Sequence, residues 1–340
     1  MIPVAPRPTQ PAPATDWKRL WRDAVRDPAE LLSLLGLTDR VPGLSTEATG
    51  QFPLRVPRGF IARMRPGDPH DPLLRQVLPL DEEMRPMPGF DLDAVGDGAA
   101  KTATGVIHKY RGRALLIATG SCAVHCRYCF RRHFPYAEET AAAGQGRDAG
   151  GPIRADASID AVILSGGDPL SLSTAKLGEL TAQLAEIPHL RRLRIHTRLP
   201  VVLPERVDDA LTDWLRTLPW PVVVVIHANH ANEFDSAVDA ALAQLRSTGA
   251  TVLNQAVLLR GVNDNIEALV ALSQRGFAAG ALPYYLHQLD RVAGAAHFEV
   301  SDEEALVLHA ALIARMPGYL VPKLVREVAG DPGKRPLVKP

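Results

Sequence analysis

Residues 113–129, RALLIATGSCAVHCRYC, decide the fold of this chain because they join an apolar strand to a loop that holds all 3 cysteines. The apolar and β-branched residues of 113–120 predict a buried strand. Cys122, Cys126 and Cys129 follow directly, at C-x₃-C-x₂-C spacing. Ligand sites of α/β proteins lie where parallel strands end and feed loops. We therefore expect this loop to carry the function.

Further apolar strands alternate with amphipathic helices after this loop. The expected strands are 113–120, 161–167, 193–197, 222–229, 251–259 and 282–289, and the expected helices are 174–185, 205–217, 232–247 and 265–275. Such alternation predicts parallel strands joined by right-handed crossovers. Because about six strands fall short of the eight of a complete barrel, we expect an α/β fold with an open, partial (βα)₆ TIM-like barrel. A doubly wound sheet is the structural alternative.

The remaining chain flanks this barrel. The expected organisation is a disordered tail at 1–15, a mainly helical and irregular N-terminal extension at 16–105, the partial barrel at 106–300, and a C-terminal helix with a last segment at 301–340. The extension is expected to begin with one helix at 16–37. Residues 140–158 are low in complexity and predict a surface loop. Residues 319–328 predict a last extended segment.

Composition excludes several classes of function. The chain has 340 residues, of which 46% are hydrophobic and 22% charged, as in ordinary soluble enzymes. Its formal net charge of +0 gives no basic field to attract nucleic acid. No apolar run approaches the ~20 residues of a membrane helix. Nothing resembles a secretory signal, so we expect a cytoplasmic protein with reduced thiols.

The three cysteines leave two metal sites open. Disulfides are disfavoured by the odd number in a reducing compartment. A structural zinc site takes four ligands, and His125 or His133 can supply the fourth. Alternatively, three thiolates can bind three irons of a [4Fe–4S] cluster and leave the fourth iron free for a small molecule. The second strand is followed by Ser165-Gly166-Gly167-Asp168-Pro169, which is either an ordinary turn or a close approach to a ligand.

The cysteine spacing after the first strand and the GGDP sequence after the second together resemble the radical S-adenosylmethionine (SAM) enzymes. More narrowly, the chain is similar to the lysine 2,3-aminomutase family in CRYCFRRHFPY (126–136), HKY (108–110), LNQAVLLRGVND (253–264), PYY (283–285), Asp290 and GKRP (333–336). These matches extend from about residue 16 to 337. The short chain, VPRGFIARM (56–64) and DPLLRQVLP (71–79) most resemble the EpmB branch, which makes β-lysine for attachment to elongation factor P.

This resemblance implies an isomerase with three cofactors. Cys122, Cys126 and Cys129 would hold a [4Fe–4S] cluster, and SAM would bind its open iron. Pyridoxal 5′-phosphate (PLP) would be attached to Lys334. Reductive cleavage of SAM would give the radical that starts the migration of the amino group of L-lysine from C2 to C3, so the cofactors carry the chemistry and the protein positions it.

The resemblance also assigns binding residues. Arg131 would hold the substrate carboxylate, and Asp290 and Glu327 would receive its distal ammonium group. The remaining assignments are Tyr110, Arg113 and Gln255 near the PLP phosphate and Gly166, Gly167 and Asp168 near SAM. Arg198 and His230 follow predicted strands, and this position makes them further candidates to face SAM. Each of these residues, taken alone, fits an ordinary structural role equally well. The chain departs from the family pattern at Lys109, Glu327 and Arg335, where arginine, aspartate and threonine are usual.

The implied partners are L-lysine, a one-electron reductant such as flavodoxin or ferredoxin, and, by functional link, elongation factor P with its lysyl ligase. Two other functions stay open on the sequence. One is an aminomutase with the same machinery that acts on a different amino acid or feeds secondary metabolism. The other is a zinc-stabilised binding or scaffold protein without radical chemistry, which would require neither the GGDP loop nor Lys334.

Overall fold

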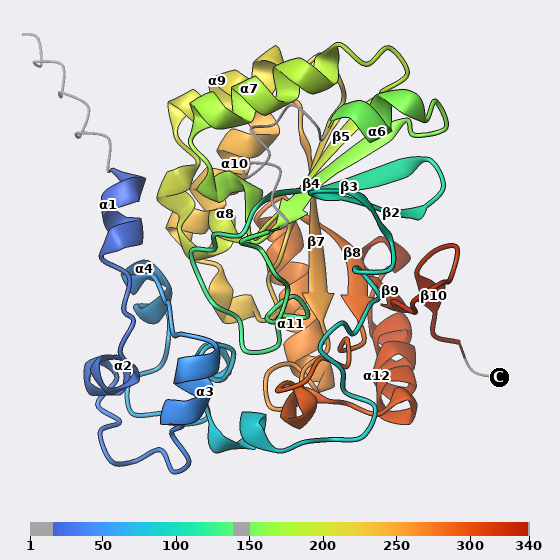
Figure 1. Cartoon of the computed structure of the whole chain (residues 1–340). Coiled ribbons are helices and arrows are strands. Elements are labelled where there is room, and N and C mark those ends of the chain that lie inside the picture. Colours follow the sequence, from blue (N-terminus) through green and yellow to red (C-terminus); the bar gives the residue numbers. More distant parts are fainter. Residues whose placement is uncertain (1–15, 139–149, 339–340) are drawn as a thin grey trace, which may run out of the picture.

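The structure is a computed structural model that describes residues 16–138 and 150–338 (Figure 1). The predicted tail at 1–15 and most of the predicted loop at 140–158 lie outside these residues. Within the described part, ten strands form one sheet in the order of the sequence. The strands are β1 (Lys101–Ala103), β2 (Val106–Tyr110), β3 (Arg113–Thr119), β4 (Ala161–Gly166), β5 (Arg192–Thr197), β6 (Val222–Ile226), β7 (Thr251–Val257), β8 (Leu282–His287), β9 (Lys323–Arg326) and β10 (Arg335–Pro336).

The strand order confirms the open, partial barrel. Neighbouring strands from β3 to β9 pair in parallel, whereas β1, β2 and β10 pair antiparallel at the two edges. The order never reverses, which excludes the doubly wound alternative because that fold has a switch point in its strand order. Strand β9 is a seventh parallel strand and lies in the segment that the sequence predicts as extended. The sheet thus ends at β1 and β10 without closing.

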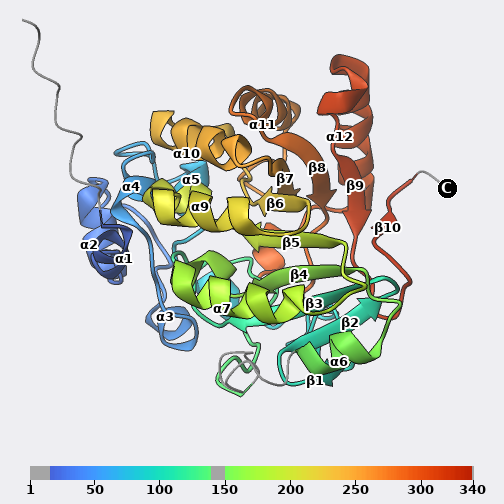
Figure 2. The ribbon, with the colours of Figure 1, turned by 90° about the horizontal axis from the view of Figure 1, so that it is seen from above.

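Helices cross over between the parallel strands and cover the outside of the sheet (Figure 2). The crossover helices are α6 (Gly150–Ala155), α7 (Thr174–Ala185), α9 (Asp209–Thr217), α10 (Ser236–Ser247), α11 (Ile266–Ala278) and α12 (Asp302–Arg315). Helix α6 corrects the prediction of a loop there. The predicted start at 205 is also corrected, because Pro204–Arg206 forms the 3₁₀ turn η3 and Asp208 caps α9. Shorter pieces are α8 (Leu199–Val202), η2 (Pro169–Ser171), η4 (Ala231–Glu233), η5 (Ala296–Phe298) and η6 (Gly318–Leu320).

The single helix expected at 16–37 is wrong. Two helices form instead, α1 (Trp17–Arg22) and α2 (Pro28–Leu34), and the chain between them is extended. Pro28 stands at the first position of α2 behind Asp27, whose side chain caps it. Proline favours that position and pushes the residue before it out of the helical region. The rest of the extension contains α3 (Thr46–Gln51), α4 (Arg58–Ile61), α5 (Pro72–Arg75) and η1 (Asp81–Met84).

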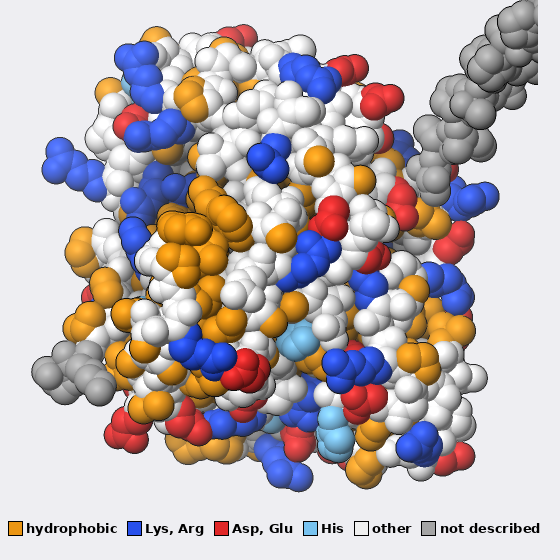
Figure 3. All heavy atoms as spheres, turned by 180° about the vertical axis from the view of Figure 1, so that it is seen from behind, with side chains coloured by type: hydrophobic (Ala, Val, Ile, Leu, Met, Phe, Trp, Pro, Cys, Tyr) orange, Lys and Arg blue, Asp and Glu red, His pale blue; other side chains and the backbone are white. Residues whose placement is uncertain are grey.

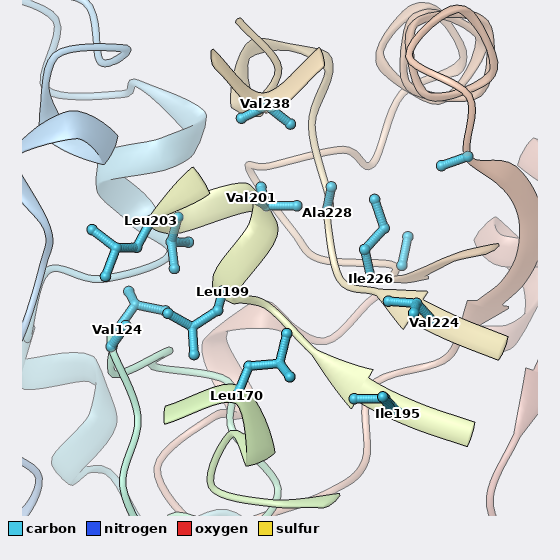
Figure 4. Close-up of a cluster of buried hydrophobic side chains, with 14 of the residues drawn as sticks. Val124, Leu170, Ile195, Leu199, Val201, Leu203, Val224, Ile226, Ala228 and Val238 are labelled. Atoms are coloured by element: carbon cyan, nitrogen blue, oxygen red, sulfur yellow. The ribbon is translucent and has the colours of Figure 1, made fainter. Parts of the chain in front are cut away.

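The apolar core continues beneath the cysteine loop. Figure 4 shows Val124 of that loop close to Leu170, Leu199 and Leu203, and all four are buried. Burying such side chains stabilises the loop by roughly 1.5–3 kcal/mol each. The loop is therefore fixed to the ends of the strands by packing as well as by hydrogen bonds.

The surface carries both signs of charge. Figure 3 shows lysine and arginine side chains interspersed with acidic ones over one face, in keeping with the net charge of zero. In the described part of the chain, helices that combine the length and the apolar character needed to cross a membrane are absent.

Candidate active site

The cysteine loop lies between the carboxyl end of β3 and the N-terminal extension. The amide of His125 donates to the Arg55 carbonyl oxygen over 3.0 Å, and the amide of Arg127 donates to the Gln76 carbonyl oxygen over 2.9 Å. The His125 ring is also 2.7 Å from the Pro53 carbonyl oxygen. The extension thus supplies backbone acceptors that hold the loop in place. The contact of the His125 ring with Pro53 is made through Nδ1.

The three thiols are partly buried and electrostatically coupled. Burial raises the pKa of Cys122 well above its usual value, and Asp168 and the other two thiols raise it further. Burial likewise raises the pKa of Cys129 to about 11. Within 16–138 and 150–338, however, the side chains do not form a group of three or more His, Cys, Asp and Glu arranged to hold a metal ion. The thiols fit an iron–sulfur ligand set by their chemistry and by their spacing in the sequence, and a bound cation favours the deprotonation of thiols.

Arg198, at the end of β5, joins the cysteine loop to a buried polar network. Its Nη1 lies 2.7 Å from Cys126 Sγ and donates to the Tyr128 hydroxyl over 2.6 Å. Its Nη2 donates to Gln76 Oε1 over 2.7 Å and to Glu233 Oε2 over 2.9 Å. The guanidinium is thereby fixed beside a thiol, where its positive charge suits an anionic ligand. The SAM contact predicted for Arg198 stays a prediction.

Gly166 and Gly167 bring the second strand-end loop onto the first. A Cβ atom on Gly166 would lie 2.4 Å from the Thr119 carbonyl oxygen, and φ at Gly166 is +118°. A Cβ atom on Gly167 would lie 2.6 Å from the Ser121 carbonyl oxygen. The close approach in this structure is therefore between two backbones, which only glycine permits. The loop after β4 supports the cysteine loop directly, and its contact with SAM stays a prediction.

The carboxylate oxygens of Asp168 accept hydrogen bonds from its own loop and from the neighbouring one. Its Oδ1 accepts hydrogen bonds from the Leu170 amide (3.0 Å) and the Thr197 hydroxyl (2.7 Å). Its Oδ2 accepts from the amides of Arg198 (2.7 Å) and Leu199 (3.1 Å). Burial nevertheless outweighs these donors and raises the pKa of Asp168 to about 6. The carboxyl group ties the loop after β4 to the loop after β5, and its predicted role toward SAM is left with few free acceptor positions.

A row of alternating charges crosses the site. Lys334 Nζ donates to Glu327 Oε2 over 2.9 Å, and Lys109 Nζ donates to Glu327 Oε1 over 3.1 Å. Lys109 Nζ is also 2.6 Å from Asp97 Oδ1, and Arg131 Nε donates to Asp97 Oδ2 over 2.7 Å. We call these five residues the charge row. It connects the predicted PLP lysine to the predicted carboxylate-binding arginine, which stands two residues after Cys129.

Arg131 is buried, with 6% of its side chain exposed. Besides Asp97, it donates from Nη1 to the Ser165 hydroxyl over 3.0 Å. A cavity of about 180 Å³ lies beside it, lined by Arg131, Asp97, Phe130 and residues of β2 and β3. Asp97 and Ser165 use two of the five N–H donors of the guanidinium, and the other donors suit a carboxylate.

The two predicted ammonium-binding acids differ in charge state. Burial opposes the ionisation of Glu327, but Lys334 and Lys109 outweigh it and lower its pKa to about 2. Burial raises the pKa of Asp290 to about 7, and Glu327 adds to this rise while Lys334 and Lys109 oppose it. The Oδ1 atom of Asp290 is buried without a hydrogen-bond partner. An unpaired buried carboxyl group next to cations is a suitable acceptor for one more ammonium group.

The predicted phosphate-binding residues, Tyr110, Arg113 and Gln255, each have a different contact in the structure. The Arg113 guanidinium is 4.4 Å from the centre of the Tyr110 ring. Burial and then the charge of Glu327 raise the pKa of Tyr110, which places its hydroxyl beside the charge row. Gln255 pairs with Tyr285 across β7 and β8, and Lys334 Nζ lies 5.6 Å from the Tyr285 ring. Gln255 Oε1 is buried without a partner.

The side chain of His230 caps the short turn that follows it. Its Nδ1 accepts a hydrogen bond from the Asn232 amide over 3.1 Å, and burial lowers its pKa. Its SAM contact stays a prediction.

The sequence analysis missed four residues of the site: Gln76, Asp97, Glu233 and His287. His287 ends strand β8, and the rule that sites gather at strand ends points to it. The other three have no local signal, because they act through partners distant in sequence.

Comparison with known proteins gives the family. No protein-family model matches the chain. An L-lysine 2,3-aminomutase from Escherichia coli (strain K12) is 48% identical over 323 residues, which cover 95% of this chain and 94% of that protein. This chain belongs to the L-lysine 2,3-aminomutase family. Its members are isomerases, so the predicted family and class of enzyme are confirmed.

Two further L-lysine 2,3-aminomutases show the range of the family. That of Haemophilus influenzae is 45% identical over 319 residues, with 94% of each chain covered. That of Clostridium subterminale is 31% identical over 332 residues, which cover 95% of this chain and 78% of that protein. A solved radical SAM methyltransferase from Sphaerobacter thermophilus has a TM-score of 0.44 and 18% identity, with 65% of this chain and 68% of that one covered. That similarity is too low to inform function.

Proposed function

We propose that this member of the L-lysine 2,3-aminomutase family converts free L-lysine to β-lysine with a [4Fe–4S] cluster, SAM and PLP. The observation that carries the proposal is the charge row, which joins Lys334 to Arg131 beside the cysteine loop. The relatives of 48% and 45% identity, both named for this activity, support it.

Cys122, Cys126 and Cys129 would hold the cluster. When bound, the cluster and SAM supply a carbon radical that can remove a hydrogen atom from the substrate. The protein contributes a fixed loop, since Val124 anchors it in the core and Gly167 packs against its backbone. Arg198 places a guanidinium beside Cys126. Arg198, His230, Gly166, Gly167 and Asp168 are the proposed surroundings of SAM.

Lys334 would hold PLP, which when bound supplies a π-system that delocalises the substrate radical. The residues around Lys334 fit this group. Arg113 and Tyr110 offer a cation and a hydroxyl for the phosphate, and Gln255 has a buried polar atom without a partner. Donors of this kind suit a phosphate. Lys109 is engaged with Asp97 and Glu327 and is therefore assigned to the charge row.

Arg131 and the two acids would bind the two ends of L-lysine. The guanidinium of Arg131 suits the carboxylate. The distal ammonium group would replace the proton on Asp290 and take over the contact with Glu327 that Lys334 gives up when it binds PLP. Glutamate as substrate would be repelled by the same acids. This favours lysine over an acidic amino acid for the same machinery.

The electron donor and the use of the product extend the proposal beyond this site. A one-electron reductant such as flavodoxin or ferredoxin would reduce the cluster. The resemblance to the EpmB branch supports transfer of the product to elongation factor P by a separate lysyl ligase. The mass of elongation factor P from cells with and without the gene tests this link, and an unchanged mass refutes it.

A turnover assay tests the activity. The protein, reconstituted without oxygen, is expected to convert L-lysine to β-lysine in the presence of SAM and a strong reductant, as measured by chiral chromatography. Lys334→Ala should abolish turnover, because the cofactor loses its attachment. Lys323→Ala is the matched control, since Lys323 is an exposed lysine on β9, and it should retain wild-type turnover. One zinc and no iron per chain, or unchanged lysine with the wild type, would contradict the proposal.

A further inference from the structure

We propose that His287 accepts the proton that the ammonium group of Lys334 must release before Nζ can bond to the carbonyl carbon of PLP. This inference rests on the proposed function, because it concerns the attachment of the cofactor to Lys334. Nζ of Lys334 lies 3.0 Å from Nε2 of His287. A neutral amine is the nucleophile in this reaction, so the lysine needs a nearby base.

The position of His287 is set by the sheet. It is the last residue of β8 and pairs with Val325 of β9 on one side and Val257 of β7 on the other. Only 3% of its surface is exposed. A ring held at the end of a central strand cannot turn away from Lys334 as a loop residue could. The side chain therefore presents a fixed acceptor, while Lys334 comes from the short connection between β9 and β10.

Lys334 Nζ has two acceptors within hydrogen-bond distance, and they differ in what else they contact. Glu327 Oε2 is 2.9 Å away. Glu327 also pairs with Lys109 over 3.1 Å, so its carboxylate is shared between two cations, whereas Nε2 of His287 faces Lys334. His287 is a neutral imidazole, because burial lowers its pKa first, and the charge of Lys334 and then His227 lower it further.

The transfer of the proton itself makes His287 a better base. While Lys334 is an ammonium, its charge disfavours a second positive charge on the imidazole. Once the proton has left Nζ, that repulsion is gone and Glu327 faces the pair with its negative charge. The titratable and charged groups around Lys334 and His287 are Glu327 of the β9–β10 connection, Tyr285 of β8, Asp290, Lys109 of β2, His227 after β6 and His196 of β5.

The step balances as a condensation. The proton moves from Nζ to Nε2, and the lone pair of Nζ forms a bond to the aldehyde carbon of PLP. The aldehyde oxygen takes protons from Nζ and from His287 Nε2 and leaves as water. A C=N bond to Nζ remains, and His287 returns to its neutral form. No oxidant or reductant is consumed. Acid–base help of this kind is worth about 10²–10⁴ in rate where it is fully used.

The test measures the rate at which PLP becomes attached to Lys334. Bound PLP is removed from the full-length protein with hydroxylamine, PLP is added back, and the C=N bond is reduced with borohydride at timed intervals. Peptide mass mapping then counts the modified Lys334. His287→Phe removes the acceptor, whereas His287→Gln keeps a polar group that cannot take up a proton. His309→Gln is the matched control, because His309 lies on α12 and contacts the Pro322 carbonyl oxygen.

At pH 7 both His287 variants should load PLP at least about tenfold more slowly than the wild type. Both should approach the wild-type rate above about pH 10, where solvent takes the proton of a lysine directly. A wild-type rate for His287→Gln at pH 7 would refute proton transfer, and so would slow loading of both variants above pH 10. Failure of the wild type to load PLP on Lys334 would instead refute the proposed function.

Discussion

The two acids near Lys334 show how single residues of one type take different roles in one site. Glu327 lies between two lysines and is ionised over the whole working range of pH, with a pKa of about 2. Asp290 has no hydrogen-bond partner at Oδ1, and burial raises its pKa to about 7. The permanent charge neutralises the resident cations. In the proposed function, Asp290 is the acid that receives the ammonium group of the substrate.

Asp290 should make the stability of the protein depend on pH. Its folded pKa of about 7 lies above the value of about 3.9 for an unfolded aspartate. The folded protein therefore binds more protons than the unfolded chain between these values, so its stability falls as the pH rises from about 4 to about 7. Urea unfolding at several pH values should show that Asp290→Asn removes up to about 4 kcal/mol of this fall.

Asp213→Asn, at an exposed position of α9, is the control and should leave the pH dependence of unfolding unchanged. Equal slopes in the wild type and Asp290→Asn would show that Asp290 is ionised like an ordinary aspartate. Because Asp168 also titrates with a pKa of about 6, only the difference between wild type and variant reports on Asp290.

Sequence reasoning named residues that the structure brings together and missed those that hold them in place. Lys334, Glu327 and Arg131 converge through the charge row, although they are far apart in the chain. Asp97, which links two of the cations, lies in a turn-rich segment without periodicity. Gln76 meets Arg198 across 122 positions of sequence. Such partners are defined by tertiary contacts, for which a single sequence has no local signal.

At the scale of elements, the site depends on the close packing of the loops after β3 and β4. Gly167 allows this, because any Cβ there would meet the Ser121 carbonyl oxygen at 2.6 Å and the backbone of Gly120 at 2.7 Å. The atoms in the way belong to backbone and cannot turn aside. The loop that carries the cysteines would have to move instead.

Gly167→Ala should therefore lower the free energy of unfolding by about 1–3 kcal/mol through overpacking. It should also reduce the iron bound per chain after anaerobic reconstitution, because the displaced backbone precedes Cys122. Gly178→Ala is the matched control. Gly178 lies inside α7, and a Cβ there would find its nearest neighbour, Trp214, at 4.0 Å.

The control should stabilise the protein by about 0.5–1 kcal/mol, as alanine does inside a helix. Chemical denaturation and iron analysis of both variants measure these effects. Unchanged stability and iron content in Gly167→Ala would show that the two loops can separate without consequence.

Elements with strong periodicity were predicted well, and those set by capping were not. The strand at 113–120 and the helix at 174–185 are found at β3 and α7 with nearly the same bounds. The helix at 16–37 divides because Pro28 and its cap Asp27 begin a new helix. Helix α6 was missed because two glycines open it, and glycine ordinarily disfavours helix.

At the scale of the whole molecule, the N-terminal extension and the partial barrel meet at a buried ion cluster. Glu83 of η1 accepts from Arg127 Nε at 2.7 Å and from Arg132 Nη2 at 2.8 Å. All three side chains are at most 2% exposed. Both arginines flank the last cysteine in sequence, so the extension fixes the cysteine loop from the side opposite the sheet.

Glu83→Gln should destabilise the protein by about 3–5 kcal/mol, because two buried guanidinium groups lose their counter-charge. Glu186→Gln is the control, since Glu186 pairs with Arg154 at the surface, where the side chains are 72% and 51% exposed, and should change stability by less than about 1 kcal/mol. Equal effects of the two substitutions on urea unfolding would show that the cluster contributes no more than a surface pair.

Lys334 lies next to β10, an edge strand that pairs with β9 through only Arg335 and Pro336. So short a ladder adds little to the fold by itself. A cofactor bonded to Lys334 would then anchor β10 to the barrel rim through a second, covalent connection. Loading the vitamin-derived group and securing β10 on β9 would be one event.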